Sequence, residues 1–94
     1  MYDFDLTNRS FCVNKQIYFR RSGQKFLILS LDRINVIELE GVAFFIWKNL
    51  QKPISYLDLL KKVKKEYNVS EVELEKDLKA WLKQAISEKI VEKI

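Results

Sequence analysis

The segment spanning residues 32–50, DRINVIELEGVAFFIWKNL, most constrains the fold because its hydrophobic period changes at a single glycine. Before Gly41, apolar side chains fall on both faces of an extended run over residues 34–40, which is typical of a β-strand. After Gly41, the apolar side chains of residues 42–50 recur at spacings of three and four, as in a helix. A strand is therefore expected to lead almost directly into a well-buried helix.

Two further strands are predicted upstream of this segment. Residues 11–19, FCVNKQIYF, alternate between apolar and polar with one break at Lys15, which predicts a single half-buried strand. Residues 20–25 contain a Ser-Gly pair suited to a turn, and residues 26–31 form a short apolar run of strand length. We expect a hairpin here, then a tight turn at residues 32–33 before the third strand.

Two helices are predicted downstream. Pro53 ends the first helical region, and Ser55 offers an N-cap for a helix that runs to about Tyr67. Ser70, with a glutamate three residues later, forms a capping box, so a third helix should begin at position 70 or 71. For the last residues, 88–94, the pattern leaves a frayed end or a short strand open.

The order of elements is three strands followed by three helices, which indicates the α+β class. We expect one domain over residues 1–94, with residues 1–10 flexible. A three-stranded antiparallel sheet is followed by three helices, and the last two resemble a helix-turn-helix. The predicted architecture is therefore winged helix-turn-helix-like.

Composition argues against catalysis. The 94-residue sequence contains no histidine and a single cysteine, Cys12, so common metal sites and an internal disulfide are not expected. Histidine is also the side chain most used for proton transfer near neutral pH. We expect a protein that is not an enzyme and that has no cofactor. Because no apolar run approaches the roughly 18 residues of a membrane span, a cytoplasmic protein without membrane contact is expected.

The net charge of +4 permits an anionic partner. The lysines of KKVKK, residues 61–65, would contact phosphates in a DNA-binding protein, but such a cluster opposite an apolar stripe is more often a solvated helix face. The acidic start of the third helix, SEVELEKD, would repel a phosphate backbone. A winged-helix transcriptional regulator is the alternative hypothesis, with nucleic acid disfavoured as a partner.

The third strand has the features of an open sheet edge. Residues 34–40 contain neither proline nor lysine, the residues that commonly block edge pairing. If strand order leaves this strand at the edge, a peptide can add to it through backbone hydrogen bonds. A homodimer joined through the same edge is a further alternative.

The sequence from about residue 11 to residue 91, nearly the whole chain, resembles the PqqD-like family, small domains that recognise leader peptides. The resemblance rests on the order and spacing of short motifs. They are Leu39-Glu40, Ile46-Trp47, Ser55 with Leu59, Tyr67, Asp77-Leu78 and Trp81-Leu82. Two positions depart from the usual pattern: Glu40 replaces an asparagine before the first helix, and Lys89 stands where glycine is frequent. Without that asparagine, the first helix lacks its usual side-chain cap.

The resemblance implies a function. Members of the family bind the leader of a ribosomally made precursor peptide, which adds as a strand to the third strand in the groove against the third helix. They present it to a separate modifying enzyme, a radical SAM protein or a leader peptidase. The implied partners are therefore a precursor leader and a modifying enzyme.

The family's binding positions can be placed on this sequence. On the strand they are Arg33, Ile34, Asn35, Val36, Ile37, Glu38 and Leu39, and on the third helix Asp77, Ala80, Trp81 and Gln84. The basic residues Arg20, Arg21 and Arg33 are candidates for pairing with acidic leader residues. Two points stay open at this stage: which parity of the strand faces the peptide, and whether Trp81 belongs to the core or to the groove.

Overall fold

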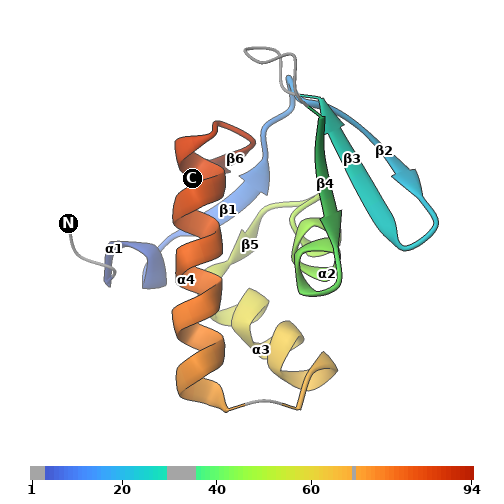
Figure 1. The fold of residues 1–94 in the computed structure, drawn as a ribbon. Helices are drawn as coiled ribbons and strands as arrows, with labels where there is room; N and C mark the ends of the chain where they lie inside the picture. The colour runs from blue at the N-terminus through green and yellow to red at the C-terminus, as the bar shows by residue number, and fades with distance from the viewer. Residues whose placement is uncertain (1–3, 30–35, 69) are drawn as a thin grey trace.

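The structure is a computed structural model that describes residues 4–29, 36–68 and 70–94 (Figure 1). Its elements are α1 (Phe4–Thr7), β1 (Ser10–Val13), β2 (Tyr18–Ser22), β3 (Lys25–Leu29), β4 (Val36–Glu40), α2 (Val42–Asn49), β5 (Ile54–Ser55), α3 (Tyr56–Glu66), α4 (Glu71–Ser87) and β6 (Val91–Lys93). The described strands form two antiparallel three-stranded sheets, ordered β5-β1-β6 and β2-β3-β4. The α+β class is confirmed, whereas the prediction of a single sheet is wrong.

The single strand predicted over residues 11–19 is divided between the two sheets. Asn14 divides it, because its side-chain oxygen accepts a hydrogen bond from the backbone N–H of Gln16 (3.0 Å) and its own carbonyl accepts one from Ile17 (3.1 Å). Asparagine favours such local turns. The Asn14 amide also donates to the carbonyl of Lys89 (2.8 Å), which ties this turn to the C-terminal end of α4. The strand prediction failed because periodicity continued across a turn.

The sheet β5-β1-β6 joins distant parts of the chain. Cys12, which is buried, pairs with Glu92 on β6, and Phe11 pairs with Ile54 on β5. Of the two alternatives for residues 88–94, the strand is the one that forms. α1 lies within the segment that was expected to be flexible, and its Leu6 packs into the core.

α4 ends in a Schellman motif. Lys89 has a φ of 63°, its N–H donates to the carbonyl of Ile86 (3.0 Å), and the N–H of Ile90 donates to the carbonyl of Ala85 (3.0 Å). This motif requires a left-handed residue directly after the helix cap, and glycine is the usual choice. The geometry explains why glycine would suit position 89, where this chain has lysine.

The hairpin and the two later helices agree with the sequence-based predictions. β2 and β3 form the hairpin, and the side chain of Ser55 accepts a hydrogen bond from the N–H of Asp58 (3.1 Å) at the start of α3. α4 begins at Glu71, as predicted. However, Ser70 makes no side-chain cap hydrogen bond, so the predicted capping box does not form.

The helices surround a core built on α2. Trp47, which has no exposed surface, meets the ring of Phe19 on β2 edge to face, with ring centroids 5.4 Å apart. Phe44 stacks on Phe26 of β3 at 4.8 Å. α2 also contacts α3, while α4 contacts α3 and β6 (Figure 1). α2 is therefore the element that links the β2-β3-β4 sheet to the other helices.

Gly41 joins β4 to α2 in a conformation that favours glycine. Its φ is 64° and its ψ is −131°, and α2 has no side-chain N-cap hydrogen bond. The lack of a side-chain cap agrees with the expectation from Glu40. Gly41 is the single residue between β4 and α2, so its conformation sets the relative direction of these two elements.

We predict that Gly41→Ala lowers the free energy of unfolding by about 1–3 kcal/mol. A Cβ at this position would meet nothing within 4 Å, so the loss arises from the backbone conformation alone. Urea unfolding followed by circular dichroism measures it. An unchanged unfolding midpoint would contradict the strained geometry of the β4–α2 junction.

Candidate functional site

β4 is an edge strand of its sheet. The order β2-β3-β4 gives it one hydrogen-bonded neighbour, β3, among the described strands. The condition for strand addition, that the strand before α2 should lie at an edge, is therefore met. In Figure 1, β4 runs down toward the start of α2. The long helix α4 lies on the opposite side of β4 from β3.

The hairpin β2–β3 determines which way the backbone groups of β3 point. The two residues Gly23 and Gln24 form its loop, with Ser22 paired to Lys25. Gly23 has a φ of 61°, as in a type II′ turn, and such a two-residue loop is closed by a hydrogen-bonded pair. The backbone groups of Lys25 therefore point at β2. Because successive residues of a strand direct these groups to opposite neighbours, those of Phe26 point at β4.

The same alternation continues onto β4. Leu39 lies opposite Phe26 and Ile37 lies opposite Ile28, so Leu39 and Ile37 exchange backbone hydrogen bonds with β3. The residues between and beside them direct their N–H and C=O groups away from β3. The groups that point at the open edge are those of Val36, Glu38 and Glu40.

The side chains of β4 alternate between a buried face and an exposed face. Ile37 is half-buried and Leu39 is buried, and both lie on the face that packs against the core. Glu38 and Glu40 lie on the opposite face and are exposed. An added strand would thus have one face toward the apolar interior and one toward solvent.

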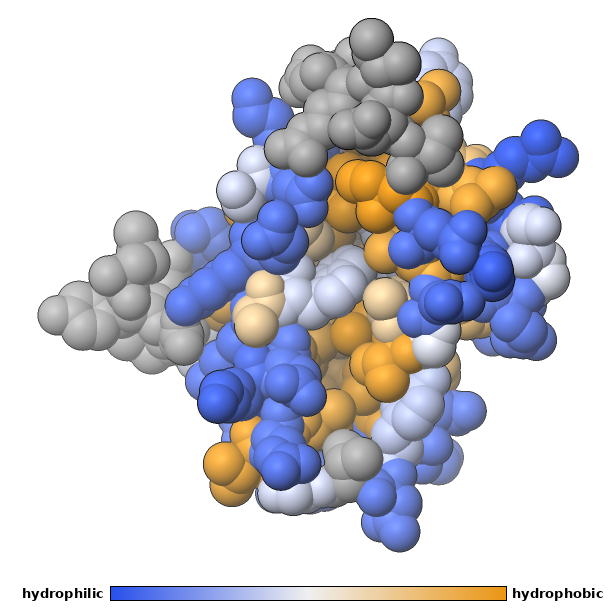
Figure 2. Space-filling model, viewed as in Figure 1, coloured by the Kyte–Doolittle hydropathy of each residue, from blue (hydrophilic) through white to orange (hydrophobic). Residues whose placement is uncertain are grey.

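A pocket of about 270 Å³ lies at the end of β4, between α2 and α4. Its lining is mostly apolar. The first lining residue along the chain is Val42, two residues after the end of β4. The lining residues are Val42, Ala43 and Ile46 of α2, Tyr67, and Glu73, Leu74, Asp77, Leu78 and Trp81 of α4. Figure 2 shows apolar side chains in the hollow between α4 and the β4–α2 segment, with hydrophilic side chains on both sides.

Two of the four positions predicted on α4 line this pocket. Asp77 and Trp81 lie on its wall, and Trp81 is half-buried. Trp47, by contrast, is wholly in the core. Ala80 and Gln84 are exposed on α4 and do not line the pocket. Gln84 donates a hydrogen bond to the carboxylate of Glu88 (3.0 Å).

Sequence reasoning did not place the α2 wall in the site. The sequence predicted a well-buried helix after Gly41, yet Val42 is 40% exposed at the pocket. The apolar arc of α2 is wider than one packing surface needs, and this width was the available signal. Tyr67, which was expected at the end of the second helix, also lines the pocket.

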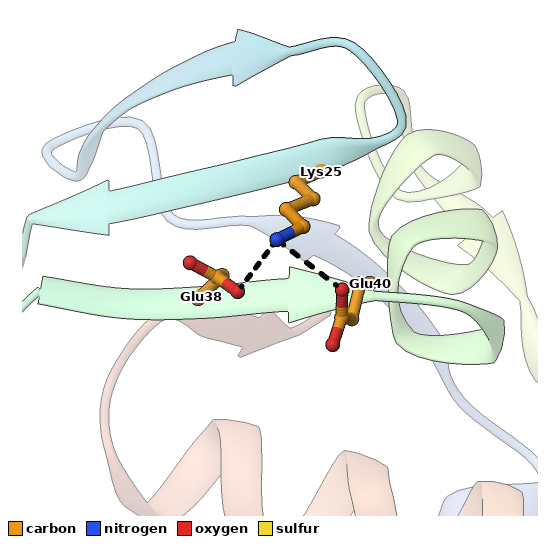
Figure 3. A network of polar contacts seen from close by, with 3 residues as sticks. All are labelled: Lys25, Glu38 and Glu40. Atoms are coloured by element: carbon orange, nitrogen blue, oxygen red, sulfur yellow. Dashed lines mark ion pairs between the residues drawn. The ribbon is translucent and has the colours of Figure 1, made fainter.

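An ion-pair network covers the outer face of β4 (Figure 3). The Lys25 ammonium lies 3.2 Å from a carboxylate oxygen of Glu38 and 3.6 Å from one of Glu40. The hydrogen bond and the charge of Glu38 raise the pKa of Lys25 above its usual 10.5, and the charge of Glu40 adds to this effect. All three side chains are exposed, so the network contributes little stability. It partly neutralises the two glutamates next to the open edge.

The remaining predicted site residues lie elsewhere. Arg33, Ile34 and Asn35 are outside the described residues, as is the predicted turn at residues 32–33. Arg20 and Arg21 are on β2, so β3 separates them from the open edge.

The Arg21 guanidinium is already engaged within the hairpin. It lies 5.0 Å from the ring centroid of Phe44, and its Nε donates to the carbonyl of Gly23 (3.0 Å). Pairing of Arg20 or Arg21 with an acidic leader stays a prediction.

The family comparison agrees with the arrangement of edge, pocket and helices. Residues 25–91 match the family model of PqqD, described as coenzyme PQQ synthesis protein D. The chain belongs to the PqqD family. The matched region extends from β3 to the start of β6 and includes β4 and every residue that lines the pocket. PqqD domains bind precursor peptides as chaperone-type partners of peptide-modifying enzymes, and this defines the class of the present domain.

No curated protein and no solved structure shows a significant match to the chain. None of the helices in the described ranges is long and apolar enough to cross a bilayer. Within those ranges, no group of three or more metal-ligating side chains has an arrangement suited to a metal ion.

Proposed function

We propose that this PqqD domain captures the leader of a ribosomally made precursor peptide by strand addition to β4. The leader lies in the groove between β4 and α4, with one or more side chains in the pocket beside α2. The domain then presents the bound precursor to a separate modifying enzyme, a radical SAM maturase or a leader peptidase. The domain itself supplies binding and positioning.

The observation that carries this proposal is the open edge of β4 beside an apolar pocket. Val36, Glu38 and Glu40 offer backbone donors and acceptors with the spacing of one strand. In strand addition, such main-chain bonds supply affinity, and pockets for alternate side chains supply specificity. The pocket is at the end of the edge where the inward-facing side chains of an added strand would arrive.

The roles of individual residues follow from this placement. Val36, Glu38 and Glu40 bond to the leader backbone, while Ile37 and Leu39 hold β4 in the sheet and form the apolar surface beneath it. Asp77 and Trp81 form the α4 wall at the pocket. Ala80 is exposed beside Trp81, and Gln84 lies almost one turn beyond Trp81, where a longer leader would pass.

A single-tryptophan variant provides a direct test of leader binding. The chain has two tryptophans, so Trp47→Phe leaves Trp81, at the pocket, as the only indole reporter. We expect saturable changes in its fluorescence on titration with the synthetic leader of a precursor encoded beside this gene, at micromolar or lower dissociation constants. Calorimetry with the unmodified chain provides the control. Absence of binding to any neighbouring leader, together with salt-sensitive binding to DNA, would contradict the proposal.

We predict that changing the four lysines of α3 to glutamine leaves leader affinity within a few fold. Lys61, Lys62, Lys64 and Lys65 are exposed on the solvent face of α3, and the Lys64 ammonium lies 3.1 Å from the Glu71 carboxylate. None of the four lines the pocket beside α4. Fluorescence anisotropy with a labelled leader measures the effect. A loss of more than tenfold would move the binding site to α3 and favour an anionic partner.

A further inference from the structure

We infer that the pocket between α2 and α4 selects leaders that place a lysine or arginine side chain in it. This inference rests on the proposed function and specifies which class of leader the site accepts. It concerns one position of the leader, because the pocket of about 270 Å³ is smaller than the roughly 300–1,000 Å³ of sites for whole ligands. A single long side chain is the occupant that fits.

The lining chemistry matches a side chain that is apolar along its length and cationic at its tip. Seven of the nine lining residues are apolar or aromatic, two are carboxylates, and none is basic. Lysine and arginine pack their methylene stems on apolar surface while the charged group stays at the polar rim. Leu74, Leu78 and Ile46 are buried residues that provide the apolar floor.

The two carboxylates are placed to receive a cation. Glu73 and Asp77 are one helical turn apart on α4, and like charges at this spacing repel each other. Both are exposed, and neither has a hydrogen-bond or ion-pair partner among the residues that the structure describes. Glu71, on the same helix, is paired with Lys64 at 3.1 Å. A cation held between Glu73 and Asp77 would relieve their repulsion.

Trp81 adds a second attractive group. It continues the same four-residue spacing along α4 and is half-buried at the pocket. The face of an indole ring attracts ammonium and guanidinium groups. Tyr67, on the other wall, already meets the ring of Phe45 edge to face at 5.7 Å, which leaves Trp81 as the stronger candidate for the cation.

Other occupants fit this pocket less well. A purely apolar side chain would cover the pocket while leaving two carboxylates partly desolvated without a counter-charge, which is unfavourable. An acidic side chain would be repelled by both. The acidic rim is also unusual for a chain with a net charge of +4, so a basic leader segment would be attracted to this part of a mostly basic surface and oriented by it.

The test combines matched changes in the protein and in the leader. The protein variant is Glu73→Gln with Asp77→Asn, and the control is Glu71→Gln with Glu75→Gln, which removes the same charge from α4 outside the pocket. The probe is the synthetic leader of the precursor encoded beside this gene. In a second set of leaders, each lysine or arginine is replaced in turn by norleucine, which keeps an apolar stem and removes the charge.

We expect the Glu73→Gln/Asp77→Asn variant to bind the leader at least tenfold more weakly, and the control variant to bind within about twofold of the unmodified protein. One norleucine replacement should cause a similar loss with the unmodified protein and little further loss with the double variant, because the two changes remove the same interaction. Asp77→Lys should restore affinity for a leader in which that basic residue is replaced by glutamate.

Two results would overturn the inference and leave the proposed function standing. One is tight binding of a leader that has no basic residue. The other is leader affinity that does not change in the Glu73→Gln/Asp77→Asn variant. If the unmodified protein binds no leader, the proposed function fails and the inference fails with it. The two failures are therefore distinguishable.

Discussion

Replacing Glu38 with proline is expected to weaken leader binding at least about tenfold while the fold persists. Proline lacks the N–H that Glu38 directs at the open edge, and its ring occupies the space that a paired strand needs. One lost hydrogen bond costs about 0.5–1.5 kcal/mol, and every 1.4 kcal/mol is a factor of ten in affinity. The added steric effect makes tenfold the lower bound. Calorimetric titration with the leader measures it.

Two matched variants isolate the backbone effect. Glu38→Ala removes the same carboxylate and the same ion pair with Lys25 but keeps the N–H, so its leader affinity should change little. Ile37→Pro removes an N–H that points at β3, and it should lower stability, because proline is tolerated in sheets only where its nitrogen faces solvent. Circular dichroism checks the fold of each variant. Equal leader affinities for Glu38→Pro and Glu38→Ala would contradict strand addition at this position.

Trp47→Ala is expected to lower the free energy of unfolding by about 3–5 kcal/mol, the range observed when a large buried aromatic side chain is truncated. Trp47 has no exposed surface and packs against Phe19 at a centroid distance of 5.4 Å, so its loss leaves a cavity between α2 and the sheet. Domains of this kind have a total stability of about 5–15 kcal/mol. The expected loss is therefore a substantial fraction of the total stability. Urea unfolding monitored by circular dichroism measures the change.

The second tryptophan provides the comparison. Trp81 is half-buried at the pocket, so Trp81→Ala should lower stability less than Trp47→Ala and leader affinity more. Trp47→Phe should cost less than Trp47→Ala, since the phenyl ring fills part of the cavity and removes an indole N–H that has no hydrogen-bond partner among the described residues. If Trp81→Ala destabilised the protein as much as Trp47→Ala, Trp81 would be a core residue instead of a pocket wall.

The parts of the fold that local signals determine were predictable. The Ser-Gly turn located the hairpin, Gly41 separated strand from helix, and Ser55 marked the start of α3. Each signal acts over a few residues, so one sequence suffices to read it. Even at Ser70 the helix start was correct although the side-chain bond does not form, because the helical period of α4 begins there independently of the cap.

The sheet β5-β1-β6 could not be read in this way. β1, β5 and β6 are four, two and three residues long, and they come from the beginning, the middle and the end of the chain respectively. Periodicity has no meaning in a two-residue strand, and pairing between distant segments depends on the tertiary fold. Asn14 was the one local clue, since its side chain can end a strand by forming a turn.

The candidate site, like the fold, was only partly predictable from the sequence. The open edge was suggested by the composition of residues 34–40, but only the strand order shows that β4 is at an edge, and only the register shows that Glu38 faces outward there. The pocket joins α2 to α4, which are more than 20 residues apart in sequence. The sequence left open whether Trp81 belongs to the core or to the groove, and the structure shows it half-buried at the pocket, unlike the fully buried Trp47.

The most direct test of leader addition to β4 is a nuclear magnetic resonance titration of the ¹⁵N-labelled protein with its leader peptide. The account predicts slowed hydrogen exchange at the amides of Val36, Glu38 and Glu40, while those of Ile37 and Leu39, already bonded to β3, change less. Chemical shifts of α4 near Asp77 and Trp81 should move at the same leader concentration. Saturable binding that leaves exchange along β4 unchanged and shifts the amides of residues 61–65 would contradict the account.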